Sequence, residues 1–224
     1  MELMLEQVPI VIRSLNVGFL QTLKLFAVTL LGAVPLGLVI AFGSMSRFRP
    51  LAYVTKIIVW IIRGTPLMIQ LLIIYYFPGL VLKNPIWGGG EAGRFLAASV
   101  SFIFNYACYF SEIYRGGIQS VPVGQEEAGL VLGMTRSQIF FKVTLLQMIK
   151  RIVPPMSNEI ITLVKDTSLA FVLTYEEMFT IAKQIAAKEA SILPLFVAGV
   201  FYFIFNFVVA FVMERIEKAM NYYR

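Results

Sequence analysis

The chain has 224 residues, of which 58% are hydrophobic and 14% are charged, and its mean hydropathy is +0.79. Ordinary soluble domains carry about 25% charged residues, so this composition excludes a soluble core and indicates an integral membrane protein. The sequence has no histidine and a single cysteine, Cys108. That content excludes a disulfide framework and argues against Cys/His zinc sites and histidine-dependent catalytic triads.

Five apolar segments are long enough to cross a bilayer, which takes about 20 mostly apolar residues in a helix. They cover residues 16–43, 52–82, 95–114, 152–174 and 191–213. We therefore expect an all-α integral membrane protein with five transmembrane helices, forming one membrane domain over residues 1–224. Small residues at four-residue spacing, Ala33, Gly37 and Ala41, predict close packing of the first helix against a neighbour.

The lysines and arginines between these segments lie mostly on one side of the predicted membrane. The cation-rich side has eleven of them: Arg47, Arg49, Lys56, Arg115, Arg136, Lys142, Lys150, Arg151, Arg215, Lys218 and Arg224. The opposite side has five: Arg13, Lys83, Arg94, Lys183 and Lys188. Cytoplasmic loops are enriched in these residues, which predicts an outside N-terminus and a cytoplasmic C-terminus. The same loops explain the net charge of +6 without a nucleic-acid-binding face.

The segment 119–150 on the positive side is too polar to span and too regular to be a loose loop. Residues 125–132 favour a short helix, which Gly133 can end in the left-handed conformation. Thr135 and Gln138 form a capping-box pattern at the start of a second helix. The segment is either a surface that a soluble partner protein binds or an inert amphipathic loop.

The spacing within this segment resembles the EAA loop of binding-protein-dependent ABC importer permeases. Three residues separate Glu127-Ala128-Gly129 from Gly133, and nine residues separate Gly133 from Val143-Thr144-Leu145-Leu146. The chain departs from the usual pattern at Gly129 for Ala, Val143 for Ile and Leu146 for Pro. The resemblance implies docking into a cytoplasmic ATPase subunit through Glu126, Glu127, Ala128, Gly129 and Gly133.

Charged residues within the apolar segments are functional candidates, because each costs about 2.5–3.5 kcal/mol at a helix centre. Arg63-Gly64-Thr65-Pro66 predicts a break in the second segment, with freed carbonyls facing a cavity. The alternative is a simple proline kink with Arg63 reaching the cytoplasmic interface. Lys165 and Asp166 are adjacent in the fourth segment and so point in different directions, which means that each needs its own partner.

Glu112 shares a helix face with Tyr109 at a spacing of three residues. A carboxylate beside an aromatic ring suits the ammonium group of an amino acid. Alternatively, Glu112 pairs with Arg115 at the same spacing or with Arg63 on the neighbouring helix.

Three further motifs resemble the polar-amino-acid branch of the same permease family, the histidine, glutamine and arginine type. They are Arg-Gly-Thr-Pro at 63–66, Glu-x-x-Arg-Gly-Gly at 112–117 and Lys-Asp-Thr-Ser-Leu at 165–169. The resemblance covers nearly the whole chain and implies a substrate pocket halfway across the membrane. Its implied lining is Thr65, Leu67, Met68, Tyr109, Glu112, Met156, Asn158 and Asp166.

These observations favour a type I ABC importer permease in the bacterial inner membrane. Such a permease works with a second permease subunit (itself or a paralogue), a cytoplasmic ATPase and an external amino-acid-binding protein. Gly88–Arg94 lacks the Lys-Ser/Thr of a phosphate loop, so ATP and Mg²⁺ are expected on the ATPase partner and no cofactor on this chain. We expect no enzyme activity.

Two competing hypotheses differ in their energy source or chemistry. An ion-coupled secondary amino acid carrier would not need the segment 119–150, and an intramembrane enzyme would need a histidine, metal or nucleophile constellation. The acids Glu112, Glu159 and Asp166 outnumber Arg63 and Lys165, which favours a cationic amino acid substrate such as arginine, lysine or histidine.

Overall fold

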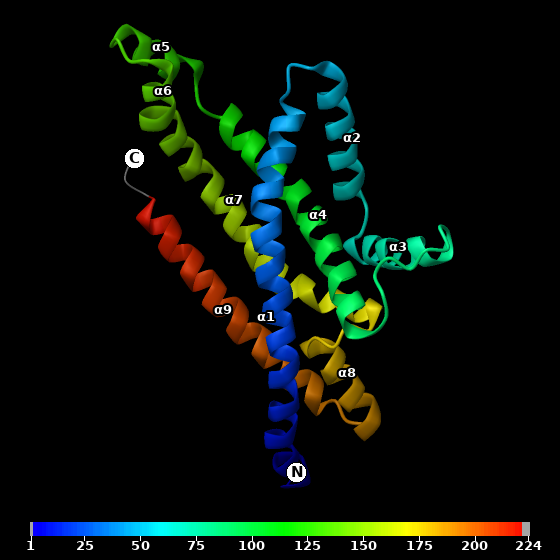
Figure 1. Cartoon of the computed structure of the whole chain (residues 1–224). Helices are drawn as coiled ribbons and strands as arrows, with labels where there is room; N and C mark the ends of the chain where they lie inside the picture. The colour runs from blue at the N-terminus through cyan, green and yellow to red at the C-terminus, as the bar shows by residue number, and fades with distance from the viewer. Residues whose placement is uncertain (1, 221–224) are drawn as a thin grey trace.

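In the computed structural model, which describes the backbone of residues 2–220 and the side chains of residues 8–220, all regular structure is helical (Figure 1). In chain order the helices are α1 (Glu2–Ser44), α2 (Arg49–Gly64), α3 (Leu67–Leu80), α4 (Gly90–Gln119), α5 (Val123–Val131), α6 (Arg136–Ile139), the π-helix η1 (Phe140–Thr144), α7 (Leu145–Asp166), the 3₁₀ helix η2 (Thr167–Leu173), α8 (Met178–Glu189) and α9 (Leu193–Ala219). The all-α prediction is confirmed for this part of the chain.

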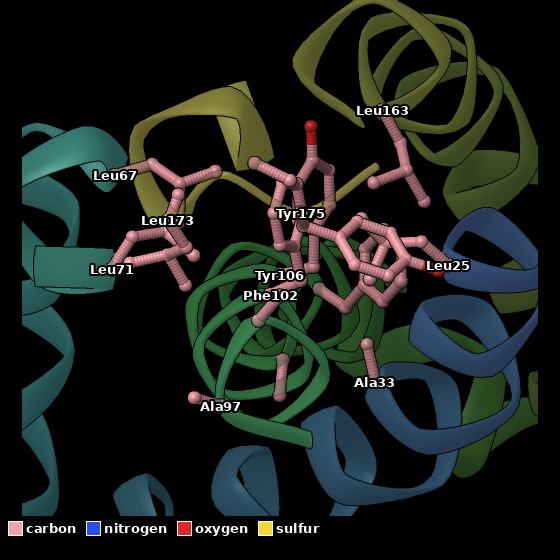
Figure 2. Packing of buried hydrophobic residues seen from close by; sticks show 14 of the residues in the cluster. Leu25, Ala33, Leu67, Leu71, Ala97, Phe102, Tyr106, Leu163, Leu173 and Tyr175 are labelled. Carbon is pink, nitrogen blue, oxygen red and sulfur yellow. The ribbon is translucent and has the colours of Figure 1, made fainter. Parts of the chain in front are cut away.

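The central helix is α4, which packs along α1 and also contacts α2, α3 and α7. Ala33 and Ala41 of α1 are fully buried, and a Cβ on Gly37 would lie 2.9 Å from the Phe110 Cβ of α4. The predicted close approach at these small residues is therefore confirmed. Figure 2 shows the core that results, where Leu25 of α1, Leu71 of α3, Phe102 of α4, Leu163 of α7 and Leu173 of η2 converge.

Helices α1 and α9 are the described helices that are long and apolar enough to cross a membrane individually, over Val8–Ser44 and Leu193–Ala219. Helices α2 and α3 would make a third crossing if together they form one bent span. Helix α4, which packs against other helices on its buried face, does not pass this test and carries Glu91, Arg94, Glu112 and Arg115 toward its two ends. Five spans remain a prediction.

The cation-rich parts of the chain lie toward one end of the molecule. The end of α1, the start of α2 and the helices α5 and α6 lie in the upper part of Figure 1, whereas the N-terminus and α8 lie in the lower part. Arg224, which we counted with the cytoplasmic cations, lies outside the described residues.

Helix α8 was not predicted, because its 12 residues are too short and too mixed in polarity to stand out. Its N-cap is Glu177, a fully buried carboxylate. The Glu177 side chain accepts hydrogen bonds from the backbone nitrogens of Phe179 (2.7 Å) and Thr180 (2.6 Å) and from the Tyr202 hydroxyl of α9 (2.9 Å). This carboxylate thereby fixes α8 against α9.

Candidate functional site

The predicted break in the second apolar segment is present between α2 and α3, whose axes differ by 110°. Thr65 ends α2 in an extended conformation, and Pro66 precedes the first residue of α3. Proline disfavours a helical conformation at the residue before it and cannot donate a backbone hydrogen bond. The turn is therefore a consequence of the local sequence, and a straight helix over residues 52–82 is excluded.

Two side chains occupy the carbonyls that the break releases. The Thr65 hydroxyl donates to the Ile61 carbonyl (2.9 Å), and Gln70 Nε2 donates to the Ile62 carbonyl (2.8 Å), the Thr65 carbonyl (3.1 Å) and Thr65 Oγ1 (2.8 Å). The Gln70 Oε1 atom accepts from Asn105 Nδ2 of α4 (2.9 Å). An amide network that we did not predict thus satisfies the Ile62 and Thr65 carbonyls, and the Arg63 carbonyl accepts a hydrogen bond from the Tyr109 hydroxyl of α4 at 3.5 Å. That freed carbonyls face a cavity stays a prediction.

Arg63, at the end of α2, turns toward α4. Its guanidinium lies 3.8 Å from a Glu112 carboxylate oxygen and 5.2 Å from the centroid of the Tyr109 ring. Glu112 also accepts two hydrogen bonds from Arg115, at 3.0 and 2.5 Å. Both pairings that we considered for Glu112 are thus present together, and the carboxylate is shared between two arginines.

Asp166, the last residue of α7, accepts a hydrogen bond from the Tyr106 hydroxyl of α4 at 2.7 Å. This tyrosine is 2% exposed, and its ring lies 6.4 Å from that of Tyr109. Tyr106 was not among the predicted residues, although it lies on α4 one turn before Phe110 and three residues before Tyr109. It provides the partner that Asp166 was expected to need and connects Asp166 to the Arg63–Glu112 group.

The remaining predicted pocket residues are divided between core and surface. Leu67 and Met156 are 9% exposed and belong to the main apolar core. Met68 is 40% exposed, and Asn158 is also exposed. The structure thus brings Tyr109 and Asp166 to Tyr106, whereas Glu112 is reached from Tyr109 through Arg63, at the helix break that Thr65 ends.

The segment 119–150 forms the predicted helix, turn and helix. Gly133 has φ of +74° and closes the end of α5, where its nitrogen donates to the Leu130 carbonyl at 2.9 Å. Thr135 and Gln138 form the expected capping box, with bonds of 3.3 and 2.9 Å. The π-helix η1 that follows was not predicted.

Gly129 makes the contact between the two helices of this segment. A Cβ at this position would lie 2.6 Å from Ile139 Cγ1, and Ile139 is 2% exposed. This packing explains the glycine at a position where the EAA pattern has alanine. Glu126, Glu127 and Ala128 are exposed on the outer side.

The segment is also tied to the helices beside it. Gln147 Nε2 of α7 donates to Gln125 Oε1 of α5 at 3.0 Å, and the Arg151 guanidinium donates to the Ser120 carbonyl. These contacts join α5 and the end of α4 to α7, the helix that ends at Asp166.

Residues 33–222 match the family described as "Binding-protein-dependent transport system inner membrane component". The chain belongs to this family. It is 38% identical to the L-cystine transport system permease protein TcyB of Bacillus subtilis (strain 168), over 93% of this chain and 87% of that protein. It is 31% identical to the arginine transport system permease protein ArtQ of the same organism, over 97% and 95% of the two chains.

Solved structures agree with this membership. An amino acid ABC transporter crystallised with histidines has a TM-score of 0.84 and 30% identity, covering 96% of this chain and 97% of that chain. An inward-facing MetNI methionine ABC transporter has a TM-score of 0.66 at 19% identity, covering 96% and 98%, and so supports the type I permease fold alone.

Family membership confirms several expectations at once. The protein is a multi-pass component of the inner membrane, and it works with a substrate-binding protein and an ATPase. Members are pore subunits of transporters and not enzymes, which confirms the expectation of no enzyme activity.

Proposed function

We propose that this chain is the permease subunit of an ATP-driven importer for a polar amino acid. The observation that carries the proposal is the exposed Glu126–Ala128 surface, held by the Gly129 contact and the Gly133 turn and tied to α7. A secondary carrier needs no such surface for a motor subunit. The ATPase partner would bind ATP and Mg²⁺, and this chain would bind no cofactor.

The proposed arrangement has two permease subunits, either two copies of this chain or this chain and a paralogue. Each would cross the membrane five times, with the second crossing broken at Pro66, the N-terminus outside and the C-terminus in the cytoplasm. The unequal distribution of cations and the position of α5 and α6 at the cation-rich end support this orientation. Residues 1–224 would form one permease domain.

The proposed mechanism is alternating access. A loaded binding protein docks outside, ATP closes the ATPase dimer, and movement of the α5 surfaces opens the pore outward. ATP hydrolysis then resets it inward.

The proposed substrate pocket uses the predicted residues Thr65, Leu67, Met68, Tyr109, Glu112, Met156, Asn158 and Asp166. Because two arginines share Glu112, Asp166 is the acid that we assign to the ammonium group. This sharing weakens the preference for a cationic substrate that a count of charges indicates. The names of the relatives make L-cystine and L-arginine the first amino acids to test.

The test is co-expression with an ABC ATPase and an amino-acid-binding protein, followed by uptake and ATPase assays in proteoliposomes across a panel of amino acids. We expect one or a few amino acids to stimulate ATPase activity and to accumulate only with ATP. Uptake driven by an ion gradient without ATP would contradict the proposal.

The coupling surface is tested by Glu127→Lys and Gly133→Val. Both should abolish substrate-stimulated ATPase activity, because one reverses charge at the docking surface and the other forces a β-branched side chain into a left-handed conformation. The matched controls are Glu189→Lys, at the last residue of α8, a helix in the lower part of Figure 1, and Gly199→Val, where a Cβ has open space. Normal coupling in the Glu127→Lys and Gly133→Val variants would refute the docking assignment.

A further inference from the structure

Helix α2 has a cationic side that stays exposed, although Arg63 at its end contacts α4. Arg49, Tyr53, Lys56, Trp60 and Arg63 follow one another at spacings of three or four residues, which places all five on one side of the helix. We call this the cation–aromatic face. All five residues are exposed, Tyr53 at 69% and Trp60 at 77%.

The other sides of α2 have different neighbours. Val59 is buried, and Thr55 packs against α1, where a Cβ on Gly43 would lie 3.1 Å from the Thr55 hydroxyl. Val54, Ile58 and Ile61 form an exposed apolar side that suits lipid. The cation–aromatic face is unsuited to lipid, because each cation would cost about 2.5–3.5 kcal/mol near the bilayer centre.

Two cavities follow the cation–aromatic face from end to end. One of about 800 Å³ is lined by Arg49, Tyr53, Lys56 and Arg115, together with residues at the end of α1. The other, of about 320 Å³, is lined by Lys56, Trp60, Arg63, Glu112 and Arg115. Lys56 and Arg115 line both, so the two cavities adjoin.

The charges lining these cavities are unbalanced. The cations are Arg49, Lys56, Arg63 and Arg115, whereas the acid is Glu112, which already pairs with two of them. The cations of α2 are seven residues apart, or about 10 Å along a helix. They extend from the break at Pro66 to the cation-rich end of the molecule (Figure 1).

We propose that the cation–aromatic face lines a water-filled passage on the cytoplasmic side of the break, where its cations hold in turn the carboxylate of an amino acid leaving the pore. This inference rests on the proposed function and names the substrate group that the exit recognises. Arginine and lysine bind carboxylates, while Tyr53 and Trp60 offer ring faces to an ammonium group. Each pair of neighbouring cations has an aromatic ring between them, so both ends of an amino acid would be held at each step.

The first experiment measures access of water to this face and uses the fact that the sequence has one cysteine, Cys108, which is buried. In a Cys108→Ala background, Trp60→Cys is compared with Ile58→Cys, its control on the apolar side of the same helix. The assembled transporter in membrane vesicles is treated with an anionic and a cationic water-soluble methanethiosulfonate. We expect reaction at Trp60→Cys only.

The relative rates of the two reagents test the cationic character. At Trp60→Cys, the anionic reagent should react about fivefold faster than the cationic one after normalisation to a free thiol. Adding Lys56→Gln should reduce this preference. No reaction at Trp60→Cys, equal reaction at both positions, or a preference that Lys56→Gln leaves unchanged would overturn the aqueous cationic passage.

The second experiment tests the role in transport with Lys56→Gln in the reconstituted transporter. Maximal uptake should fall about threefold or more, with little change in KM, because release follows loading from outside. Lys56→Arg should restore uptake, and Arg47→Gln, an exposed cation outside the face, is the control. Normal uptake by Lys56→Gln alongside the expected labelling would refute the carboxylate role. A wild-type transporter without ATP-driven amino acid uptake would instead refute the proposed function and leave the labelling result unaffected.

Discussion

Replacing Gln70 with leucine should destabilise the junction between α2 and α3. Gln70 is 7% exposed, and its amide makes three hydrogen bonds to the end of α2 and one to Asn105. Leucine has a similar size but leaves the Ile62 carbonyl and the Asn105 amide without this partner. Each buried polar group left unsatisfied costs about 1–3 kcal/mol, and measured interhelical bonds in membranes average about 0.6 kcal/mol. We therefore expect a loss of roughly 2–4 kcal/mol.

The assay is unfolding of the purified transporter by sodium dodecyl sulfate in mixed micelles, combined with a double-mutant cycle. Gln70→Leu and Asn105→Leu should be coupled by about 1 kcal/mol, because each removes the same interhelical bond. Gln147→Leu is the control, since Gln147 makes a single exposed amide bond. A Gln70→Leu cost no larger than that of the control, or independent effects of Gln70 and Asn105, would refute the reasoning.

Three further predictions test other contacts. Gly129→Ala should raise the number of ATP molecules consumed per substrate transported, because the new Cβ would displace Ile139. Adding Ile139→Ala to this variant should restore coupling. An unchanged stoichiometry in Gly129→Ala would contradict this packing argument. Asp166→Asn should raise the KM for uptake about tenfold, because it removes the charge that attracts an ammonium group. Tyr106→Phe should raise the KM less. An equal rise in KM in the two variants would assign Asp166 a structural role only. Glu177→Ala should lower stability to detergent unfolding by about 2–4 kcal/mol, because it removes the α8 cap and a bond to α9; a loss below 1 kcal/mol would show that the cap is dispensable.

The features that could be predicted from the sequence are those that depend on neighbouring residues. The break at Pro66, the left-handed turn at Gly133 and the capping box at Thr135 each follow from the backbone preferences of a few consecutive residues. The apolar segments likewise predict where the long helices lie.

The features that were missed depend on partners far apart in the chain. Gln70 bonds to Asn105, 35 residues away, and Tyr106 bonds to Asp166, 60 residues away. Helical periodicity shows which residues share a face but not which face of another helix lies opposite. The one signal present for Gln70 was a carboxamide four residues after Pro66, within an otherwise apolar run.

The amide network at the helix break has a consequence for how energy can enter the protein. Carboxamides neither take up nor release protons, so neither a pH difference nor the membrane voltage acts on Gln70 or Asn105. A response of the angle between α2 and α3 to such gradients would have to come from the charged groups beside the break, such as Arg63 and Glu112. The network itself responds only to displacement of the helices that it joins, α2, α3 and α4.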